Sequence, residues 1–125
     1  MTTDQPALRI GLLISPDLFF TSKVTGTAQA LGLRVDSVDN IASVKSRLEA
    51  GDIGCVLLDL AAPRVSVAEL LTAMPDSARV PIIAFGSHVN VELLESARAA
   101  GAEVMPRSQF SATLPDILRQ HLAEM

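Results

Sequence analysis

The chain has 125 residues, 49% of them apolar, and a formal net charge of -4. This length suffices for one domain with a buried core, and the acidic balance argues against nucleic acid binding, which needs a basic surface. Its single cysteine excludes an internal disulfide. No apolar run reaches membrane-spanning length, and the first residues, MTTDQPALR, lack the apolar core of a secretory signal, so we expect a cytoplasmic protein without membrane contact.

Two patterns of apolar residues alternate along the chain, one typical of strands and one typical of helices. Continuous apolar runs predict buried strands, and apolar residues three or four positions apart predict helices, most of them followed by glycine. Asn40 is the expected N-cap of the second helix. The expected strands cover 8–14, 33–38, 53–60, 80–85 and 103–106. The expected helices cover 17–32, 40–51, 66–74, 90–102 and 111–125.

This alternation predicts an α/β fold built from βαβ units, with a parallel sheet covered by helices on both faces. Right-handed crossovers favour a flavodoxin-like, doubly wound sheet of five strands, (βα)5, in the order 2-1-3-4-5. We expect one domain over residues 1–125, with no repeat and no linker. Ligands of such sheets lie outside the carboxyl ends of the strands.

The third expected strand ends on a carboxylate at that edge. The stretch CVLLDLAAP (55–63) places four apolar residues before Asp59 and a proline four positions after it. Cys55 belongs to the apolar run and is expected in the core rather than in a reactive role. Asp59 is therefore the candidate around which any chemistry of this fold is expected.

Three stretches together resemble response-regulator receiver domains. CVLLDLAAP resembles their third strand, a hydrophobic run followed by D-x-x-x-P, and VPIIAFGS (80–87) resembles their fourth strand. ARAAGAEVMPRSQF (97–110) is similar to the fifth-strand region, which usually has a lysine and a proline before a phenylalanine. The resemblance covers nearly the whole chain and implies a CheY-like signalling domain of a bacterial two-component pathway or phosphorelay.

Receivers that accept a phosphoryl group carry an acidic pair after the first strand, which helps to bind Mg²⁺. Here those positions hold Ser15 and Pro16, and Asp17 follows one position late, where it is expected to begin a helix. Receivers usually have a serine or threonine at the end of the fourth strand, and Gly86 occupies that position here, with Ser87 one residue later. Phosphoryl transfer to a carboxylate needs a cation, because the two groups repel each other.

The usual lysine is also absent: an ungapped match puts Ser108 at its position, and a shift of one residue puts Arg107 there. We therefore expect a degenerate pseudo-receiver that is not an enzyme, binds no metal or cofactor, and contacts a kinase, a phosphotransfer protein or another signalling protein. The alternative is a genuine phosphoryl-accepting response regulator with Asp59 as the acceptor. Under that alternative, Asp17 or a backbone carbonyl helps Asp59 to hold Mg²⁺.

If Asp59 is not phosphorylated, we expect it to have a structural role. Its carboxylate is placed to accept hydrogen bonds from the loop that follows it, or from Ser15, Ser87 or Arg107. An ion pair with Arg107 would hold the edge of the sheet closed, and the alternative is an exposed loop arginine. We expect such a pair to be partly exposed, and a buried, unpaired Asp59 is the other possibility.

The fourth and fifth helices are the expected contact surface. In receivers this region commonly mediates dimerisation, and the resemblance implies a possible homodimer through residues 90–102 and 111–125. The charged residues Glu92, Glu95, Arg98, Asp116 and Arg119 lie outside the apolar stripes of both helices. An ordinary solvated surface is the alternative. Of the two phenylalanines at 19–20, one is expected on the sheet and the other over a neighbouring helix or loop.

Overall fold

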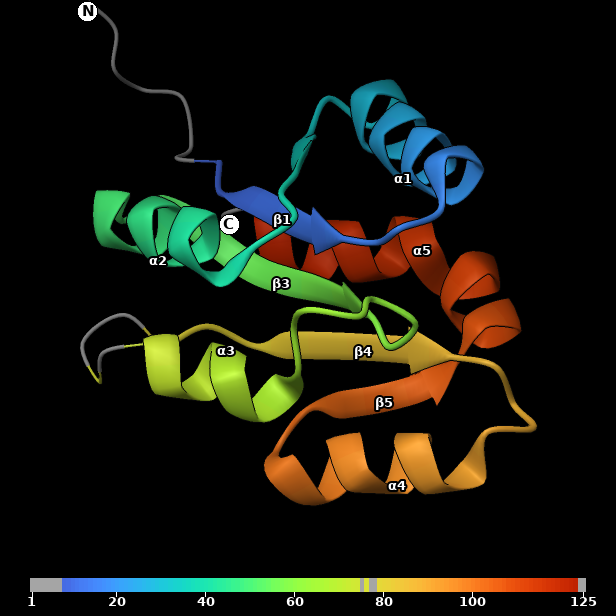
Figure 1. Ribbon diagram of the computed structural model, residues 1–125. Helices are drawn as coiled ribbons and strands as arrows, with labels where there is room; N and C mark the ends of the chain where they lie inside the picture. The colour runs from blue at the N-terminus through green and yellow to red at the C-terminus, as the bar shows by residue number, and fades with distance from the viewer. Residues whose placement is uncertain (1–7, 75, 77–78, 124–125) are drawn as a thin grey trace, which may run out of the picture.

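The sheet of this computed structural model has the predicted topology. The structure describes residues 8–74, 76 and 79–123. Its five strands are all parallel and lie in the order β2-β1-β3-β4-β5, which confirms the flavodoxin-like prediction (Figure 1). The strands are β1 (Ile10–Ile14), β2 (Arg34–Ser37), β3 (Ile53–Asp59), β4 (Ile82–Gly86) and β5 (Glu103–Pro106).

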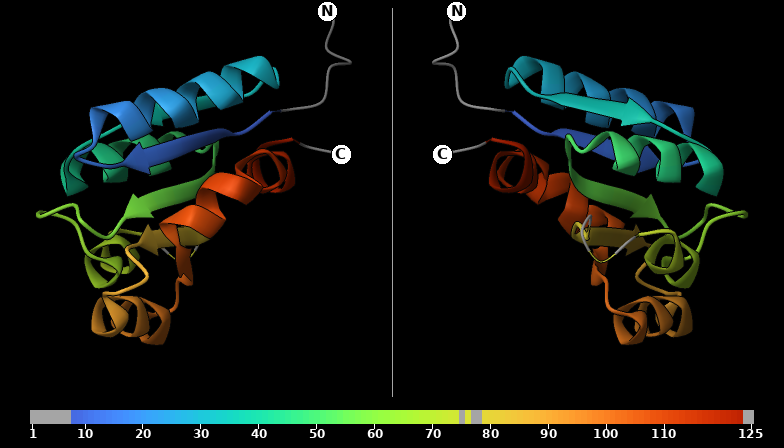
Figure 2. Two further views of the ribbon diagram at one scale, coloured as in Figure 1. Left: turned by 90° about the vertical axis from the view of Figure 1, so that its right-hand side faces the viewer. Right: turned by 90° about the vertical axis from the view of Figure 1, so that its left-hand side faces the viewer.

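Helices cover both faces of the sheet, with α1 and α5 on one side and α2, α3 and α4 on the other (Figures 1 and 2). No described helix has the length and apolar character needed to cross a bilayer. A single domain over residues 1–125 stays a prediction, since residues 1–7 and 124–125 lie outside the described part of the chain. The helices are α1 (Leu18–Ala30), α2 (Ile41–Ala50), α3 (Val67–Ala73), α4 (Val91–Ala100) and α5 (Arg107–Leu122).

Short polar side chains set the helix starts. Asp17, Asn40 and Ser66 each accept a hydrogen bond from the backbone N–H three residues later, which satisfies a donor that the first helical turn leaves free. α2 and α4 end at Gly51 and Gly101, whose φ angles of 89° and 116° are in the left-handed region that favours glycine. These are the starts and stops that the sequence pattern predicts for α1, α2 and α4.

Two apolar layers form the core, one on each face of the sheet. β3 lies in the middle of the sheet, and all seven of its residues are buried. The layer under α1 and α5 contains Phe20, Phe85 and Phe110, whose rings contact one another. This cluster lies beneath the carboxyl ends of β3, β4 and β5 and becomes the floor of the site described below.

The start of α5 corrects the sequence prediction. The helix begins at Arg107, four residues before the expected start at residue 111, and it runs through Pro115. Phe110 explains the earlier start, because it is buried at helical spacing from Leu114 and Ile117. Arg107 therefore lies on the first turn of a helix rather than in a loop. β4 is also shifted, to residues 82–86 from the expected 80–85.

The environments of the two adjacent phenylalanines, Phe19 and Phe20, differ in part from the prediction. Phe20 is buried among the aromatic rings, as expected for one of the pair. Phe19 is 91% exposed, so the prediction that it covers a neighbouring helix or loop is wrong. Leu18 is exposed beside it, because both side chains point away from the sheet at the first turn of α1.

Candidate functional site

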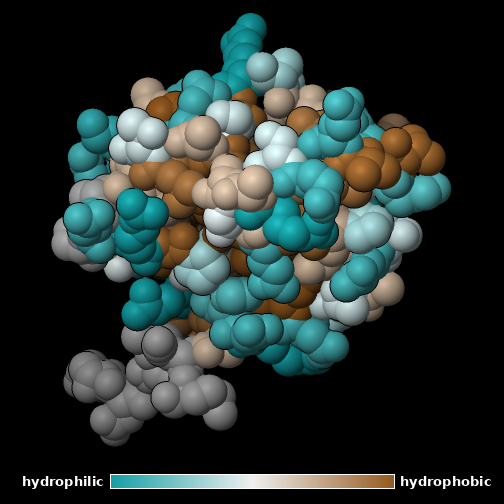
Figure 3. Space-filling view, turned by 90° about the horizontal axis from the view of Figure 1, so that it is seen from below, coloured by the Kyte–Doolittle hydropathy of each residue, from teal (hydrophilic) through white to brown (hydrophobic). Residues whose placement is uncertain are grey.

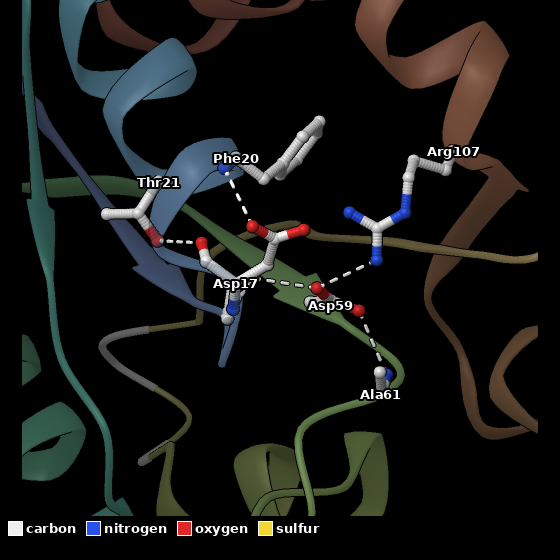
Figure 4. Close-up of polar contacts among 7 residues, drawn as sticks. Asp17, Phe20, Thr21, Asp59, Ala61 and Arg107 are labelled. Carbon is white, nitrogen blue, oxygen red and sulfur yellow. Dashed lines mark hydrogen bonds and ion pairs between the residues drawn. The ribbon is translucent and has the colours of Figure 1, made fainter.

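Asp59 ends β3 at the carboxyl edge of the sheet and is fully buried, with 0% of its surface exposed. It is the only buried polar or charged residue within the described part of the chain. Both carboxylate oxygens are engaged (Figure 4): Oδ1 accepts from the backbone N–H of Ala61 at 2.9 Å, and Oδ2 accepts from the Ser15 hydroxyl at 2.7 Å. The partly exposed carboxylate expected from the sequence is thus a buried one.

Arg107 supplies the positive charge at this site. Its Nη2 donates to Asp59 Oδ2 at 3.0 Å, so the predicted ion pair is present, and the arginine side chain is 34% exposed. The guanidinium carbon lies 4.8 Å from the centre of the Phe20 ring and 5.4 Å from that of Phe85. Nη1 is buried without a hydrogen-bond partner in the described residues, and these aromatic faces are its favourable surroundings.

The aromatic floor under Arg107 is the part of the site that sequence reasoning missed. The rings of Phe85 and Phe110 stack with centroids 4.2 Å apart, and Phe20 lies 5.1 Å from Phe85. Their signal in the sequence is only that all four phenylalanines, Phe19 included, fall near strand ends or helix starts. Their convergence depends on the sheet order, which brings α1, β4 and α5 together.

The acidic residue nearest to the first strand is used for helix capping. Asp17 Oδ1 accepts from the backbone N–H of Phe20 at 3.1 Å, and the Thr21 hydroxyl donates to the Asp17 carbonyl at 2.9 Å (Figure 4). The backbone N–H of Asp17 donates to the Ser15 hydroxyl at 3.2 Å. Pro16 lies exposed between Ser15 and Asp17. This segment therefore orients Ser15 toward Asp59 and presents no acidic pair.

The other predicted residues do not reach Asp59. Gly86 ends β4, and the Ser87 hydroxyl accepts from the backbone N–H of Val89 at 3.4 Å; none of its described hydrogen bonds involves Asp59. Ser108 is the exposed second residue of α5. The structure thus brings Ser15 and Arg107 to Asp59, and it does not bring Ser87 or Ser108 there.

Two carboxylates at this edge of the sheet, Asp59 and Asp17, are both engaged by other groups of the protein. Mg²⁺ favours hard oxygen ligands, usually carboxylates. Within the described residues no group of three or more acidic, histidine or cysteine side chains is placed to hold a metal ion. Asp59 already faces the Arg107 guanidinium, and Asp17 caps α1. The described contacts of the site are those of one buried carboxylate that is held by an arginine.

Cys55 lies on the same strand as Asp59 and is also fully buried. Burial away from water raises the pKa of its thiol from 9.0 to about 12, because the thiolate form is disfavoured there. A thiol held in its protonated form is a poor nucleophile. His88 is exposed in the loop after β4, and His121 lies near the end of α5.

No family model matches the chain, and the search of curated proteins also finds no match. Solved structures do match. A response regulator receiver domain from Bermanella marisrubri aligns at 15% identity and a TM-score of 0.74, with 90% of this chain and 96% of that one covered. The receiver domain of a sensor histidine kinase from Pseudomonas aeruginosa, which holds Mg²⁺ in its active site cleft, aligns at 22% identity and a TM-score of 0.73. The alignment covers 92% of this chain and 98% of that one.

A phosphorylated cyanobacterial phytochrome response regulator, RcpA, aligns at 14% identity and a TM-score of 0.73, covering 92% of this chain and 94% of that chain. At these identities the likeness concerns the fold. The chain therefore has the fold of CheY-like receiver domains over its described residues, with a site at the end of β3 in which an arginine faces the aspartate.

Proposed function

We propose that this chain is a receiver-type signalling domain that works by protein contact, without Mg²⁺-dependent phosphorylation of Asp59. The receiver fold supports the signalling class, and the resemblance of the three sequence stretches supports the same class. No reaction and no cofactor are assigned to the chain in this proposal.

The observation that carries the proposal is the complete burial of the Asp59 carboxylate together with its pairing to Arg107. A phosphoryl acceptor needs an accessible oxygen and a metal cation that neutralises the incoming group. Asp59 is fully buried and hydrogen-bonded at both oxygens, and its charge is matched by Arg107. Receivers of the same fold include a phosphorylated one and one with Mg²⁺ in its cleft, whereas this chain has Ser15 and Pro16 in place of the acidic pair.

Treatment with a small phosphodonor and Mg²⁺, followed by intact mass spectrometry, tests the proposal. We expect the mass of the wild-type protein to stay unchanged while a receiver of known phosphorylation chemistry, run in parallel, gains one phosphate. A gain of one phosphate that is lost in Asp59→Asn would contradict the proposal. That result would establish the alternative, a genuine phosphoryl acceptor, for which the place of Asp59 at the end of β3 is the supporting observation.

Exposed apolar side chains support a role in protein contact. Seen from the side of α4, the surface mixes hydrophilic side chains with hydrophobic ones lying between them (Figure 3). Val89, Val91 and Leu93 are exposed at the start of α4, and Leu18 and Phe19 are exposed at the start of α1. The partner in this proposal is a kinase, a phosphotransfer protein, another signalling protein or a second copy of the chain.

A homodimer through α4, β5 and α5 is part of this proposal. The arginines expected to reach across it are paired within their own helices, Arg98 with Glu95, and Arg119 with Asp116 at 3.4 Å. Such exposed pairs are weak and can exchange partners, so a dimer is expected to be sensitive to salt. Sedimentation at low and high salt, with Arg98→Glu and Arg119→Glu, checks this. A monomer at high protein concentration in low salt would exclude the dimer.

A further inference from the structure

Arg107 also borders a second feature of the structure, which Asp59 does not line. A cavity of about 510 Å³ opens between α1, the loop after β4 and the start of α5. Its polar lining consists of Lys23, Ser87, His88, Arg107, Ser108 and Ser111, and its apolar lining is Phe20 and Pro106. This volume is within the range of small-molecule sites, which commonly combine an apolar wall with a few convergent polar groups.

The charge of this lining is opposite to that of the whole chain. The chain carries a net charge of -4, yet the described lining of the cavity holds Lys23, Arg107 and a histidine and no carboxylate. Asp59 does not line the cavity, and although it offsets part of the Arg107 charge, Lys23 adds a second positive charge to the lining. The electrostatics of the cavity therefore favour an anion.

The lining also offers hydrogen-bond donors suited to an oxyanion. Three serine hydroxyls line the cavity, and one of them, Ser111, is bonded to the Lys23 ammonium across the space between α5 and α1. Arg107 and Ser108 are the first two residues of the sixteen-residue α5, which has no side-chain cap at its start. The positive end of that helix adds to the charge of the side chains.

We propose that this cavity binds the phosphate group of a small phosphate ester. Lys23, Arg107 and the three serine hydroxyls contact the phosphate oxygens, and the apolar wall of Phe20 and Pro106 contacts the organic part. A phosphate group suits this lining because it presents several acceptor oxygens to several donors from different elements. The proposal is independent of whether Asp59 is ever phosphorylated.

The test is a titration of the full chain followed by amide NMR, with EDTA present to remove divalent cations. The probes are AMP, inorganic phosphate and adenosine. AMP is expected to give saturable shifts of the Ser87, Ser108 and Ser111 amides. Inorganic phosphate is expected to shift the same amides with lower affinity, because it lacks an organic part. Adenosine, which has no phosphate, is expected to shift none of them.

Two lysine variants make the test specific. Lys23→Gln is expected to weaken AMP binding about tenfold, because it removes a charge-assisted hydrogen bond from the site. Lys45→Gln removes the same charge from the exposed face of α2 and is expected to leave the affinity unchanged. Arg107 is left intact because it also pairs with Asp59.

Four results would overturn the proposal. The first is the absence of saturation by AMP in the millimolar range. The second is binding of adenosine as tightly as AMP, which would show that the phosphate is not recognised. The third is an unchanged AMP affinity in Lys23→Gln. The fourth is a set of shifts centred on Ala61, which would place the ligand at Asp59 rather than in the cavity.

Discussion

Asp36 and Asp59, two of the carboxylates that are paired with arginine, differ in their access to water. Asp36 lies on β2 at one edge of the sheet, contacts Arg34 and Arg47 at 2.8 Å, and keeps 23% of its side chain exposed. Asp59 lies on the central strand β3, contacts Arg107 at 3.0 Å, and has no exposed surface. The edge carboxylate has two arginines and the central one has a single arginine.

The number of arginines does not indicate how much stability is lost when one arginine is removed from each carboxylate. If Asp36 loses an arginine, water takes its place, so the net stabilisation by such exposed pairs is small. If Asp59 loses Arg107, its charge stays buried with only the Ser15 hydroxyl and one backbone N–H beside it. Breaking a buried pair on one side is therefore far more costly than breaking an exposed one.

The largest effect is expected for Arg107→Met, which removes the charge but keeps an apolar side chain over the aromatic rings. We expect a loss of about 3 kcal/mol in the free energy of unfolding, near the low end for broken buried pairs because Arg107 itself is partly exposed. Denaturant unfolding at neutral pH measures it. Arg119→Met, at an exposed pair of the same helix, is the control and should cost less than about 0.5 kcal/mol. Equal losses in both variants would contradict the comparison.

Cys55 provides a second buried titratable group on β3, without any charged partner. Because its folded pKa of about 12 lies above the ordinary 9.0, its contribution to stability is complete below pH 9 and is lost as the pH rises toward the folded pKa. We expect the wild type to lose about 2 kcal/mol more than Cys55→Ala between about pH 9 and pH 11. Urea unfolding of both proteins across this range checks it, and parallel losses would contradict the assigned burial effect.

Asp59→Asn removes the acidic partner of the same ion pair, where Arg107→Met removes the basic one. It leaves the Arg107 guanidinium without its carboxylate, but that side chain is one-third exposed and water can reach it. The expected cost is about 1–2 kcal/mol, which is less than that of Arg107→Met. The same unfolding experiment measures it. A cost above that of Arg107→Met would mean that the arginine, and not the carboxylate, is the group that depends on the pair.

Asp36→Asn is expected to have the smallest effect, at most about 1 kcal/mol and reduced by salt. The hydrogen bond from Arg34 lowers the pKa of Asp36 below 3.8, against an opposing effect of partial burial, and Arg47 lowers it further. Its stabilisation is therefore present above pH 3.8 and is lost as the pH falls through the folded pKa. The free energies of unfolding of the wild type and the variant should therefore become equal at a pH below the folded pKa of Asp36, as acid unfolding measures. A difference that persists there would reject the ion-pair origin.

The sequence predicted the fold well because the fold depends on local patterns. The apolar run of β3 and the caps at Asn40 and Asp17 each carry their signal within a few residues. The start of α5 was missed because only Phe110 marks its first turn as apolar. A search for apolar residues at i, i+4 and i+7 that starts from Phe110 would have found it, because these positions hold Phe110, Leu114 and Ile117.

The site was predicted less completely because it depends on distances between elements. The place of Asp59 at a strand end follows from the strand pattern, and the pairing with Arg107 was one of two open alternatives. Its complete burial was not predictable, since it requires Ser15 from the loop after β1 and Arg107 from α5 above the rings of Phe20 and Phe85. No local pattern reports that convergence.

In the function that we propose, Arg107 supplies the positive charge at Asp59 that a phosphoryl-accepting site takes from Mg²⁺. A calorimetric Mg²⁺ titration of the wild-type protein, alongside Asp59→Asn, tests it most directly. Our account predicts the same weak, non-saturable heats for both proteins, because Ser15 and Pro16 replace an acidic pair and Asp59 is already neutralised. Saturable binding of one Mg²⁺ in the millimolar range or tighter, lost in Asp59→Asn, would contradict it.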